Sequence, residues 1–244
     1  MKLIPRKAWG ARPPHGDYAH IATTHGVKVH YTGSTVKTAP SHPKDCAALV
    51  RAIQAEHMDG RAWIDIGYTA LVCHHGYVFE GRGLFHLPAA NGAGLNAGHY
   101  AVCGLVGNKG LVLPSPAMLN GIRDAIQWLR SNGGAGNEIK GHRDGYSTDC
   151  PGPKLYAWVK AGAPRPGHAV SWPGRLLKRP KVGTLQHGDD VFEVQHMLAK
   201  AGFPVTIDGI YGSKTEAAVK AFQKAHGLLV DGIVGRETWA ALAT

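Results

Sequence analysis

The chain has 244 residues, which is long enough for one larger and one smaller domain. Of these residues 44% are hydrophobic and 18% are charged, a composition typical of a folded globular protein. No apolar run reaches the roughly 20 residues that cross a membrane, so we expect no membrane insertion. The charged N-terminus lacks the apolar core of a signal peptide, so we expect the protein to be made in the cytoplasm.

The formal net charge of +10 indicates an anionic partner such as a nucleic acid, an anionic lipid or an acidic polymer. No basic helix is interleaved with base-stacking aromatic residues, so we expect no nucleic acid. The four cysteines, at positions 46, 73, 103 and 150, show no paired spacing, and a disulfide framework is not expected in a cytosolic chain. Cys73 and Cys103 lie in apolar runs and are predicted to be small buried side chains.

The spacing of apolar residues predicts the elements of the first 160 residues. They are a loop-rich start over 1–25, a strand over 27–31, a loop over 32–43, a helix over 45–58, strands over 65–73 and 77–80, a Gly-rich loop over 86–98, a strand over 99–106 and a helix over 116–131. His74-His75-Gly76 between two strands predicts a hairpin, and the Gly-rich loop is expected to rim a cleft. This order predicts an α/β domain over 1–160, with a mixed central β-sheet flanked by helices.

The next stretch, 161–184, is predicted to be a linker, semi-rigid because four prolines interrupt it. From position 150 to 188 the chain holds seven Lys or Arg and no acidic residue. This charge serves either solubility or adhesion to an anionic polymer.

Residues 185–244 contain an internal repeat. The sequence DGIYGSKT at 208–215 recurs as DGIVGRET at 231–238, and each copy predicts a glycine-bearing turn that leads into a helix. Ser213 and Glu216 are spaced as a capping box. Apolar stripes predict three short helices, and so a small all-α domain with a thin core.

The stretch GHRDGYSTDCPG at 141–152 contains two candidate metal ligands. His142 and Cys150 stand eight residues apart on a polar loop, short enough to bring both side chains onto one ion. Imidazole and thiolate are good zinc ligands, and His30, at the end of the first predicted strand, is the third candidate. Taken singly, either histidine is better explained as a satisfied core residue than as a zinc ligand. Two histidines and a cysteine, with a position left for water, form the ligand set of a catalytic zinc suited to amide hydrolysis.

Two further residues are candidates for direct roles in such a reaction. The hydroxyl of Tyr68 could donate to an oxyanion without a cost in charge, although a tyrosine there is also a common half-buried strand residue. Thr148 is held near the metal by its connection to Cys150. Four other histidines are interpreted as surface or cleft residues and not as ligands: His74, His75, His86 and His99.

These residues lie in an order that resembles a known family. Residues 1–160 resemble the zinc amidases that include phage amidase lysozymes and peptidoglycan recognition proteins. The matching pieces are Trp9-Gly10-Ala11-Arg12, His30-Tyr31-Thr32, Ile53-Gln54 with His57, the stretch from Trp63 to Tyr68, Phe79-Glu80-Gly81-Arg82-Gly83, Leu95-Asn96 and the stretch 141–152. The resemblance implies an N-acetylmuramoyl-L-alanine amidase, which cuts between the sugar and the first residue of the stem peptide.

Carried over by position, the resemblance implies zinc ligands at His30, His142 and Cys150 and catalytic contacts from Tyr68 and Thr148. Non-catalytic recognition proteins lack the cysteine ligand, so the presence of Cys150 implies an enzyme. The resemblance also implies substrate contacts at three positions, two of which depart from the family pattern. These positions are Arg82, Asn91, which stands where a cleft histidine is common, and Asn96, which follows a leucine instead of a tyrosine.

Residues 185–243 resemble the three-helix peptidoglycan-binding domain of bacteria, through Val194-Gln195, Phe222-Gln223 and the two DG turns. This resemblance implies binding to wall glycan or peptide. The rim of the turns is the expected contact surface, with Asp208, Tyr211 and Asp231 as its candidates, although the turn glycines are equally explained by turn geometry.

Together, these features predict a monomeric, zinc-dependent peptidoglycan hydrolase, namely a phage endolysin made in the host cytoplasm that reaches the wall after the membrane is permeabilised. Its expected partners are bacterial peptidoglycan and anionic wall polymers. The alternatives are a non-enzymatic peptidoglycan-recognition protein and a bacterial wall-remodelling or recycling amidase.

Overall fold

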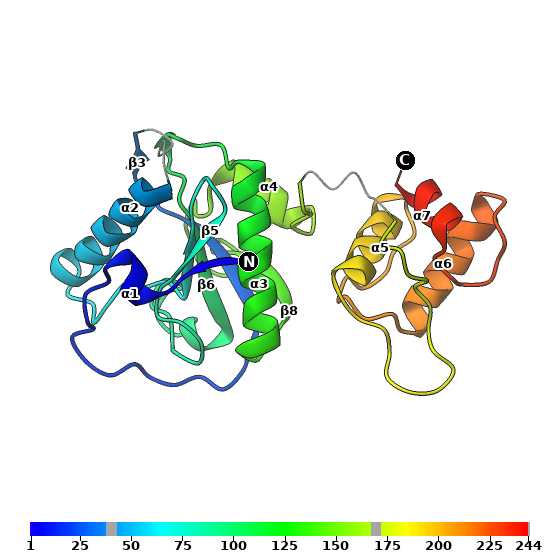
Figure 1. The fold of residues 1–244 in the computed structure, drawn as a ribbon, viewed down its shortest axis with the longest axis horizontal. Helices are drawn as coiled ribbons and strands as arrows, with labels where there is room; N and C mark the ends of the chain where they lie inside the picture. Colours follow the sequence, from blue (N-terminus) through cyan, green and yellow to red (C-terminus); the bar gives the residue numbers. More distant parts are fainter. Residues whose placement is uncertain (38–42, 167–171, 244) are drawn as a thin grey trace. The chain divides into compact units, whose positions relative to one another are not determined.

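The computed structural model describes residues 1–37, 43–166 and 172–243, and the chain divides into two compact units, 1–166 and 167–244. Figure 1 shows a sheet with helices in the first unit and helices alone in the second. The predicted fold class, a mixed α/β domain followed by a small helical domain, is confirmed.

The first unit is built on a six-stranded sheet with the order β1-β5-β4-β6-β2-β8. Its strands are β1 (Lys2–Ile4), β2 (Thr24–Tyr31), β4 (Ala70–Val72), β5 (Tyr77–Glu80), β6 (His99–Gly104) and β8 (Ala135–Gly141). β4 and β5 form the predicted antiparallel hairpin, and every other neighbouring pair is parallel. All residues of β4 and β6 are buried, which explains why they read as continuous apolar runs in the sequence.

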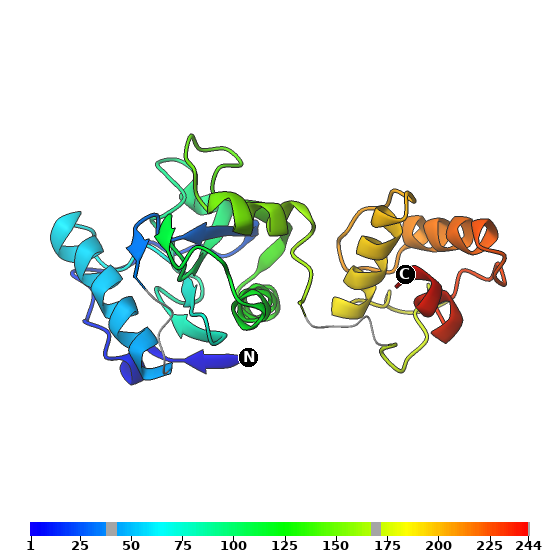
Figure 2. The same cartoon turned by 90° about the horizontal axis from the view of Figure 1, so that it is seen from above.

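Helices cover the sheet. α3 (Pro116–Asn132) lies on one side of it and α2 (Pro43–Ala55) on the other, and α4 (Gly152–Lys160) packs against β8 and β2 (Figures 1 and 2). The stripe predicted for α3 is buried, and Ser115 caps its start by accepting a hydrogen bond from the Met118 amide at 3.0 Å. A π-helical turn, Glu56–Gly60, continues α2 and brings His57 into the interior.

Residues 1–25 are more regular than predicted. β1 pairs in parallel with β5, and a short helix, α1 (Arg6–Trp9), follows it. Trp9 is 1% exposed, and its indole nitrogen donates to the Glu80 carbonyl at 2.9 Å. The predicted loop over 32–43 contains β3 (Thr35–Val36), which pairs with β7 (Lys109–Gly110), while its residues 38–42 lie outside the described residues. These elements are too short to carry a periodic pattern.

The two ends of the predicted linker over 161–184 belong to the two units, although most of its described residues are exposed. At its start, Ala163 is fully buried, and the Trp158 indole donates to the Pro164 carbonyl at 2.7 Å, so this part belongs to the first unit. Towards its end, Leu177 is fully buried in the second unit and exchanges backbone hydrogen bonds with Val234. The part at 167–171 lies outside the described residues.

The second unit has the three predicted helices: α5 (Asp189–Lys200), α6 (Ser213–Ala225) and α7 (Arg236–Leu242). The predicted capping box is wrong. Gly212 is the N-cap residue of α6, no side chain caps that end, and Glu216 instead pairs with Lys220 at 2.7 Å. Glycine at an N-cap leaves the first amides without a side-chain acceptor.

Two buried glutamines hold the repeated turns of this unit. The Gln195 amide nitrogen donates to Asp208 Oδ1 at 2.8 Å, and its oxygen accepts from the Gly209 amide at 2.7 Å. Gln223 does the same in the second copy, with Asp231 Oδ1 at 2.8 Å and the Gly232 amide at 2.9 Å. The repeat in the sequence is therefore a repeat of one hydrogen-bonded turn.

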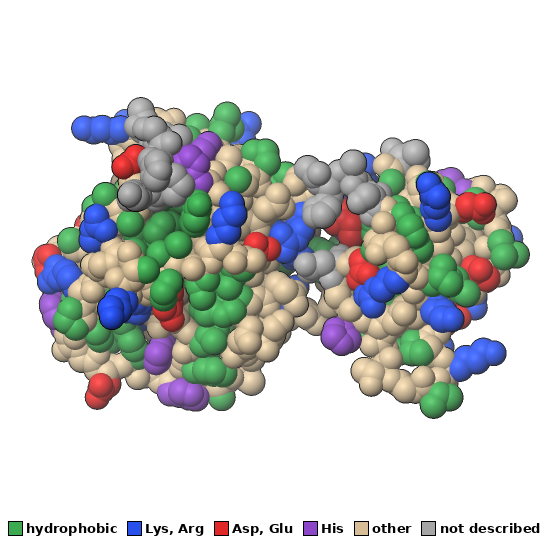
Figure 3. Space-filling model, viewed as in Figure 1, with side chains coloured by type: hydrophobic (Ala, Val, Ile, Leu, Met, Phe, Trp, Pro, Cys, Tyr) green, Lys and Arg blue, Asp and Glu red, His purple; other side chains and the backbone are tan. Residues whose placement is uncertain are grey.

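No helix among the described residues combines the length and the apolar character needed to cross a membrane. On the face drawn in Figure 3, Lys and Arg side chains of the first unit are spread out instead of gathering into one patch. On that face, the positive charge of the first unit is therefore distributed over the surface.

Candidate metal centre

Two of the predicted ligands meet because their strands are parallel neighbours. β2 and β8 pair in parallel, with Val29 opposite Gly141, so the residues that follow these two positions lie at the same edge of the sheet. His30 follows Val29, His142 follows Gly141, and the His142 amide donates to the Val29 carbonyl at 3.2 Å. The carboxyl edge of parallel strands is where α/β proteins commonly place their ligands.

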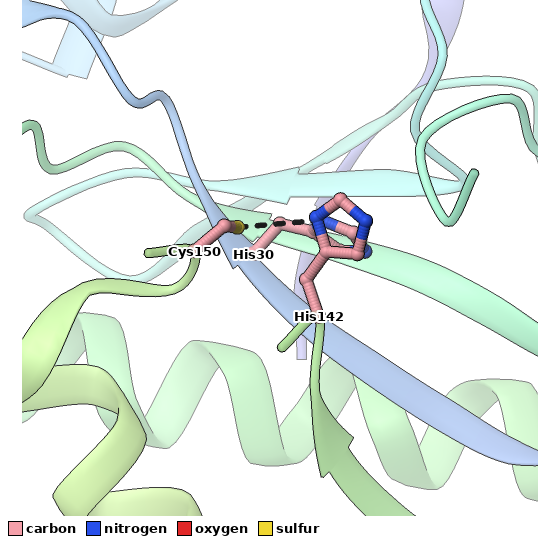
Figure 4. A group of neighbouring side chains, drawn as sticks. All are labelled: His30, His142 and Cys150. Atoms are coloured by element: carbon pink, nitrogen blue, oxygen red, sulfur yellow. Dashed lines mark hydrogen bonds between the residues drawn. The ribbon is translucent and has the colours of Figure 1, made fainter. Parts of the chain in front are cut away.

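The loop after β8 returns the third ligand to this edge. The Arg143 amide donates to the Cys150 carbonyl at 3.0 Å, which closes the loop. Asp144 braces it, because its carboxylate accepts from the Gly141 amide at 2.8 Å and from the Tyr156 hydroxyl at 2.7 Å. The Tyr31 amide in turn donates to the Cys150 sulfur at 3.4 Å. In Figure 4 the three side chains therefore point toward one another from separate segments.

The spacing of the three side chains suits a single ion. One ligand atom from each of His30, His142 and Cys150 lies within 4.8 Å of the other two, and His30 Nδ1 is 3.5 Å from the Cys150 sulfur. A tetrahedral zinc places a sulfur and a nitrogen ligand about 3.6 Å apart. Within the described residues, the buried Nε2 atom of His142 has no hydrogen-bond partner. Because a buried nitrogen normally finds a partner, these residues fit a metal ion.

Asn91 sets the orientation of the His30 ring. Asn91 is fully buried, its amide nitrogen donates to the His99 carbonyl at 2.7 Å, and its oxygen therefore faces His30 Nε2 at 2.9 Å. An oxygen acceptor at Nε2 keeps the proton there, which leaves the lone pair of Nδ1 directed at the Cys150 sulfur.

Tyr146 covers the other histidine. Its ring stacks on His142 with the centroids 4.9 Å apart and the planes inclined by 15°. Gly92 makes room for it, because a β-carbon at Gly92 would lie 2.6 Å from the Tyr146 ring. Tyr146 was not predicted from the sequence, although its position between His142 and Cys150 in the same loop is a signal for it.

Burial keeps the three candidate ligands uncharged. It lowers the pKa of His30 to about 3, with the nearby His142 as a second cause, and it lowers the pKa of His142 as well. Burial also raises the pKa of the Cys150 thiol to about 12. Neutral imidazoles are ready to bind a metal, and a thiolate at this depth needs a cation beside it.

The centre opens into a cavity of about 710 Å³. Its walls include the side of α2, the π-helical turn and the loop before Cys150, and they contribute Leu49, Ala52, Ile53, Glu56, His57, Arg61, Trp63, Tyr68, Ala90, Asn108, Thr148 and Asp149. Tyr68 and Thr148 therefore lie in the same cavity as the candidate ligands. From the loop at 86–98 that was expected to rim a cleft, Ala90 is the described residue that lines this cavity.

Tyr68 sits beside the histidines with its hydroxyl protonated. Its ring centroid is 5.5 Å from that of His30 and 5.5 Å from that of His57. Burial, followed by the nearby thiols, raises its pKa well above the usual range, and a hydrogen bond with the Cys103 thiol is among the smaller causes. Cys103 is fully buried, as predicted, but it also contacts a candidate catalytic group.

His57 is a cavity residue that the sequence analysis did not assign to the site. Its Nδ1 accepts from the Gly67 amide at 3.0 Å, and burial lowers its pKa to about 4. Its ring packs at 4.7 Å on Trp63. The signal available was its place in the motif shared with the amidases. These contacts make His57 a neutral side chain that fixes the wall beside Tyr68.

Comparison with known proteins agrees with this geometry. Over 191 residues, which are 74% of this chain, the sequence is 34% identical to the human N-acetylmuramoyl-L-alanine amidase. It is also 31% identical to a peptidoglycan recognition protein of Trichoplusia ni, over 65% of this chain and 85% of that protein. The chain belongs to this family of peptidoglycan recognition proteins and amidases. Residues 187–242 match the model of a peptidoglycan binding domain family.

Solved structures of the family share the fold of the first unit. Wild-type PGRP-LB of Drosophila superposes with a TM-score of 0.59 at 26% identity, over 70% of this chain and 94% of that one. The ectodomain complex of PGRP-LCa and PGRP-LCx bound to tracheal cytotoxin matches with a TM-score of 0.60 at 26% identity, over 71% of this chain and 97% of that one. The chain spans about a third of the length of the human amidase, 33%.

The residues expected to contact substrate lie mostly inside the protein. Arg82 is 7% exposed and donates to the Ile66 and Leu87 carbonyls at 2.8 and 2.7 Å, so it holds the backbone of the unit. Asn91 acts on His30, as described above. Asn96 is half-buried, and its oxygen accepts from the Asn91 amide at 2.9 Å. The polar groups of Arg82 and Asn91 are therefore engaged by protein, and direct substrate contact by these two residues stays a prediction.

The rim predicted for the second unit is partly wrong. Tyr211 is fully buried and donates to the Gly232 carbonyl at 3.1 Å, so it is a core residue that ties the two repeated turns together. Asp208 and Asp231 bind their own turns through the glutamines Gln195 and Gln223. Of the three, Asp231 is exposed and lines a cavity.

Replacing Asn91 is expected to weaken metal binding. The Asn91→Leu variant removes the acceptor at His30 Nε2, and loss of such an orienting contact typically costs about 10- to 100-fold in metal affinity. Competition with a coloured chelator measures this affinity directly. Asn91→Asp keeps an oxygen acceptor and should retain most of it. Equal affinities for the leucine variant and the wild type would contradict the orienting role.

Proposed function

We propose that this chain is a zinc-dependent N-acetylmuramoyl-L-alanine amidase, which hydrolyses the amide between N-acetylmuramic acid and L-alanine of the stem peptide. The observation that carries the proposal is the convergence of His30, His142 and Cys150 at one end of a cavity that Tyr68 and Thr148 also line. The relatives named as amidases support it.

Three side chains would hold the ion. His30 would use Nδ1, which faces the Cys150 sulfur at 3.5 Å, and Cys150 would bind through that sulfur. His142 would use Nε2, which has no hydrogen-bond partner among the described residues. When bound, zinc supplies Lewis-acid chemistry, which activates water at neutral pH and polarises the carbonyl of the scissile amide. The cavity has room for a substrate beside the ligands.

Two hydroxyl groups would assist the reaction. Tyr68 stays protonated because burial raises its pKa, so its hydroxyl can donate to the oxygen that gains charge as the amide is attacked. Thr148 Oγ1 accepts from the Cys150 amide at 3.2 Å, which fixes its position and leaves its proton free to face the cavity. Both groups are neutral and add no charge to a buried site.

The second unit would keep the enzyme on its substrate. The matched peptidoglycan binding domain supports attachment to the wall, and attachment raises the effective concentration of the site near its insoluble substrate. We expect the chain to act as a monomer, because each unit has its own hydrophobic core.

We further propose a role as a phage endolysin. The chain would be made in the host cytoplasm and would reach the wall once the membrane has been permeabilised. The pairing of an amidase-type cavity with a wall-binding unit supports this role. Expression in bacteria tests it: lysis should follow only when a pore-forming protein is induced with the chain. Lysis without membrane opening, or none in either case, would contradict the role.

Mass spectrometry of digested peptidoglycan tests the bond that is cut. The proposal predicts free stem peptides that begin with L-alanine, together with glycan strands of undiminished length. Shortened glycan strands, or cleavage within the stem peptide, would contradict the amidase assignment. Undigested walls that nevertheless bind the protein would favour a pure recognition protein.

A further inference from the structure

The second unit has a hollow of about 740 Å³, here called the basic pocket. It is lined by Lys178, Arg179, Pro180, Lys181, Glu216, Asp231, Gly232 and Ile233. One wall is the segment 178–181, which precedes residues 187–242 of the matched domain family. The other wall comes from the second repeated turn and from α6. The basic pocket is therefore formed partly by the matched family domain and partly by a segment that lies outside the match.

A framework of hydrogen bonds holds the added wall in place. Leu177 and Val234 exchange backbone bonds of 3.2 and 2.8 Å, and Leu177 is fully buried. Gln186 closes the segment, because its oxygen accepts from the Lys178 amide at 2.7 Å and its nitrogen donates to the Leu176 carbonyl at 3.2 Å. The backbone that carries the lysines is thus fixed against the second turn.

Both acidic groups of the basic pocket are already engaged. The Glu216 carboxylate lies 2.7 Å from the Lys220 ammonium and 3.4 Å from Arg179. Asp231 Oδ1 accepts from the Gln223 side chain and from the Ile233 amide, both at 2.8 Å. Glu216 is therefore paired with cations of its own, whereas Asp231 stabilises the turn through neutral hydrogen-bond donors.

Two lysines of the pocket keep their charge uncompensated. Lys178 and Lys181 are exposed, and among the described residues neither ammonium group has a carboxylate within ion-pair distance. At the first repeated turn the His187 backbone pairs with Ile210, as Leu177 pairs with Val234 at the second turn. The segment with the two lysines therefore lies against the second turn.

We propose that the basic pocket binds an oxyanion carried by the bacterial wall, either a carboxylate of the peptide or a phosphodiester of an attached polymer. Lysine ammonium groups bind such oxygens as point charges, and two of them on one rigid wall can share a single group. This inference rests on the proposed function, since it takes the wall to be the target. It gives the segment 178–181, which carries both lysines, a role in binding the wall.

Sedimentation of the full chain with purified walls tests the proposal. Lys178→Gln with Lys181→Gln should weaken binding about fivefold to tenfold, and raised salt should narrow the difference, since exposed charge contacts are modest and screened. The matched control replaces Lys200 and Lys224 with glutamine, which removes the same charge from exposed positions outside the pocket. Unchanged binding by the pocket variant, or an equal loss in the control, would overturn the proposal.

Two further wall preparations identify the source of the oxyanion. If the wild type binds walls stripped of phosphodiester polymers only as weakly as the pocket variant does, the ligand is the phosphodiester. If amidation of the wall carboxylates does so instead, the ligand is the peptide. A difference between wild type and variant that survives both treatments would overturn the proposal. Release of stem peptides from soluble fragments, measured in parallel, reports the amidase separately, so the two proposals can fail independently.

Discussion

Replacing His142 with alanine, or Cys150 with serine, is expected to abolish wall hydrolysis. Each change removes one of the three candidate ligands, and metal catalysis contributes several kcal/mol to such a reaction, so the rate should fall by at least about 10³-fold. Release of stem peptides from purified walls measures the effect. Sedimentation with walls should be unchanged, because wall binding is proposed for the separate second unit.

A matched control separates metal binding from loss of a histidine in general. His15 is exposed and lies outside the cavity, so His15→Ala should hydrolyse walls like the wild type. Circular dichroism of each variant would show whether the fold survives. A folded Cys150→Ser protein that hydrolyses walls at the normal rate would exclude this site as the catalytic centre.

Tyr68→Phe is expected to have the second largest effect. Loss of one donor to an oxyanion costs about 10²–10³-fold in kcat, whereas the ring, which packs beside His30 and His57, is preserved. The zinc content and KM should therefore stay close to those of the wild type. Steady-state kinetics on a soluble muramoyl peptide, with zinc analysis of the same sample, measures both.

Tyr77→Phe is the control for this variant, since Tyr77 lies in β5 outside the cavity and should lose no activity. If Tyr68→Phe lowered kcat only in proportion to lost zinc, the hydroxyl would be a support of the metal centre and not a donor to the reaction. If kcat were unchanged with full zinc content, the proposed contact with the oxyanion would not exist.

Much of the candidate metal centre could be predicted because its signals are local. His30 ends an alternating strand, and His142 and Cys150 are joined by a short loop with turn residues, so three ligands could be named from spacing and chemistry. The stripe of α3 and the repeat in the second unit were also local patterns, and the structure contains the helices that they predicted. Patterns of this kind follow from the geometry of single elements.

Contacts between distant segments could not be predicted in this way. Asn91 reaches His30 across 61 residues, and its fully buried side chain supports the ring. Tyr211 was expected on a rim but fills the core between the two turns. Leu177 pairs with Val234, so one buried residue anchors a mostly exposed, proline-rich stretch to the second unit. Each of these contacts depends on tertiary packing between distant segments, which no local sequence pattern predicts.

The zinc content of the purified chain tests the central claim most directly. Elemental analysis of the full-length protein should find one zinc per chain, and none in Cys150→Ser or His142→Ala purified in the same way. Activity lost to a chelator should return with added zinc in the wild type alone. A wild-type protein that hydrolyses walls without any bound metal, or variants that retain their zinc, would contradict the account.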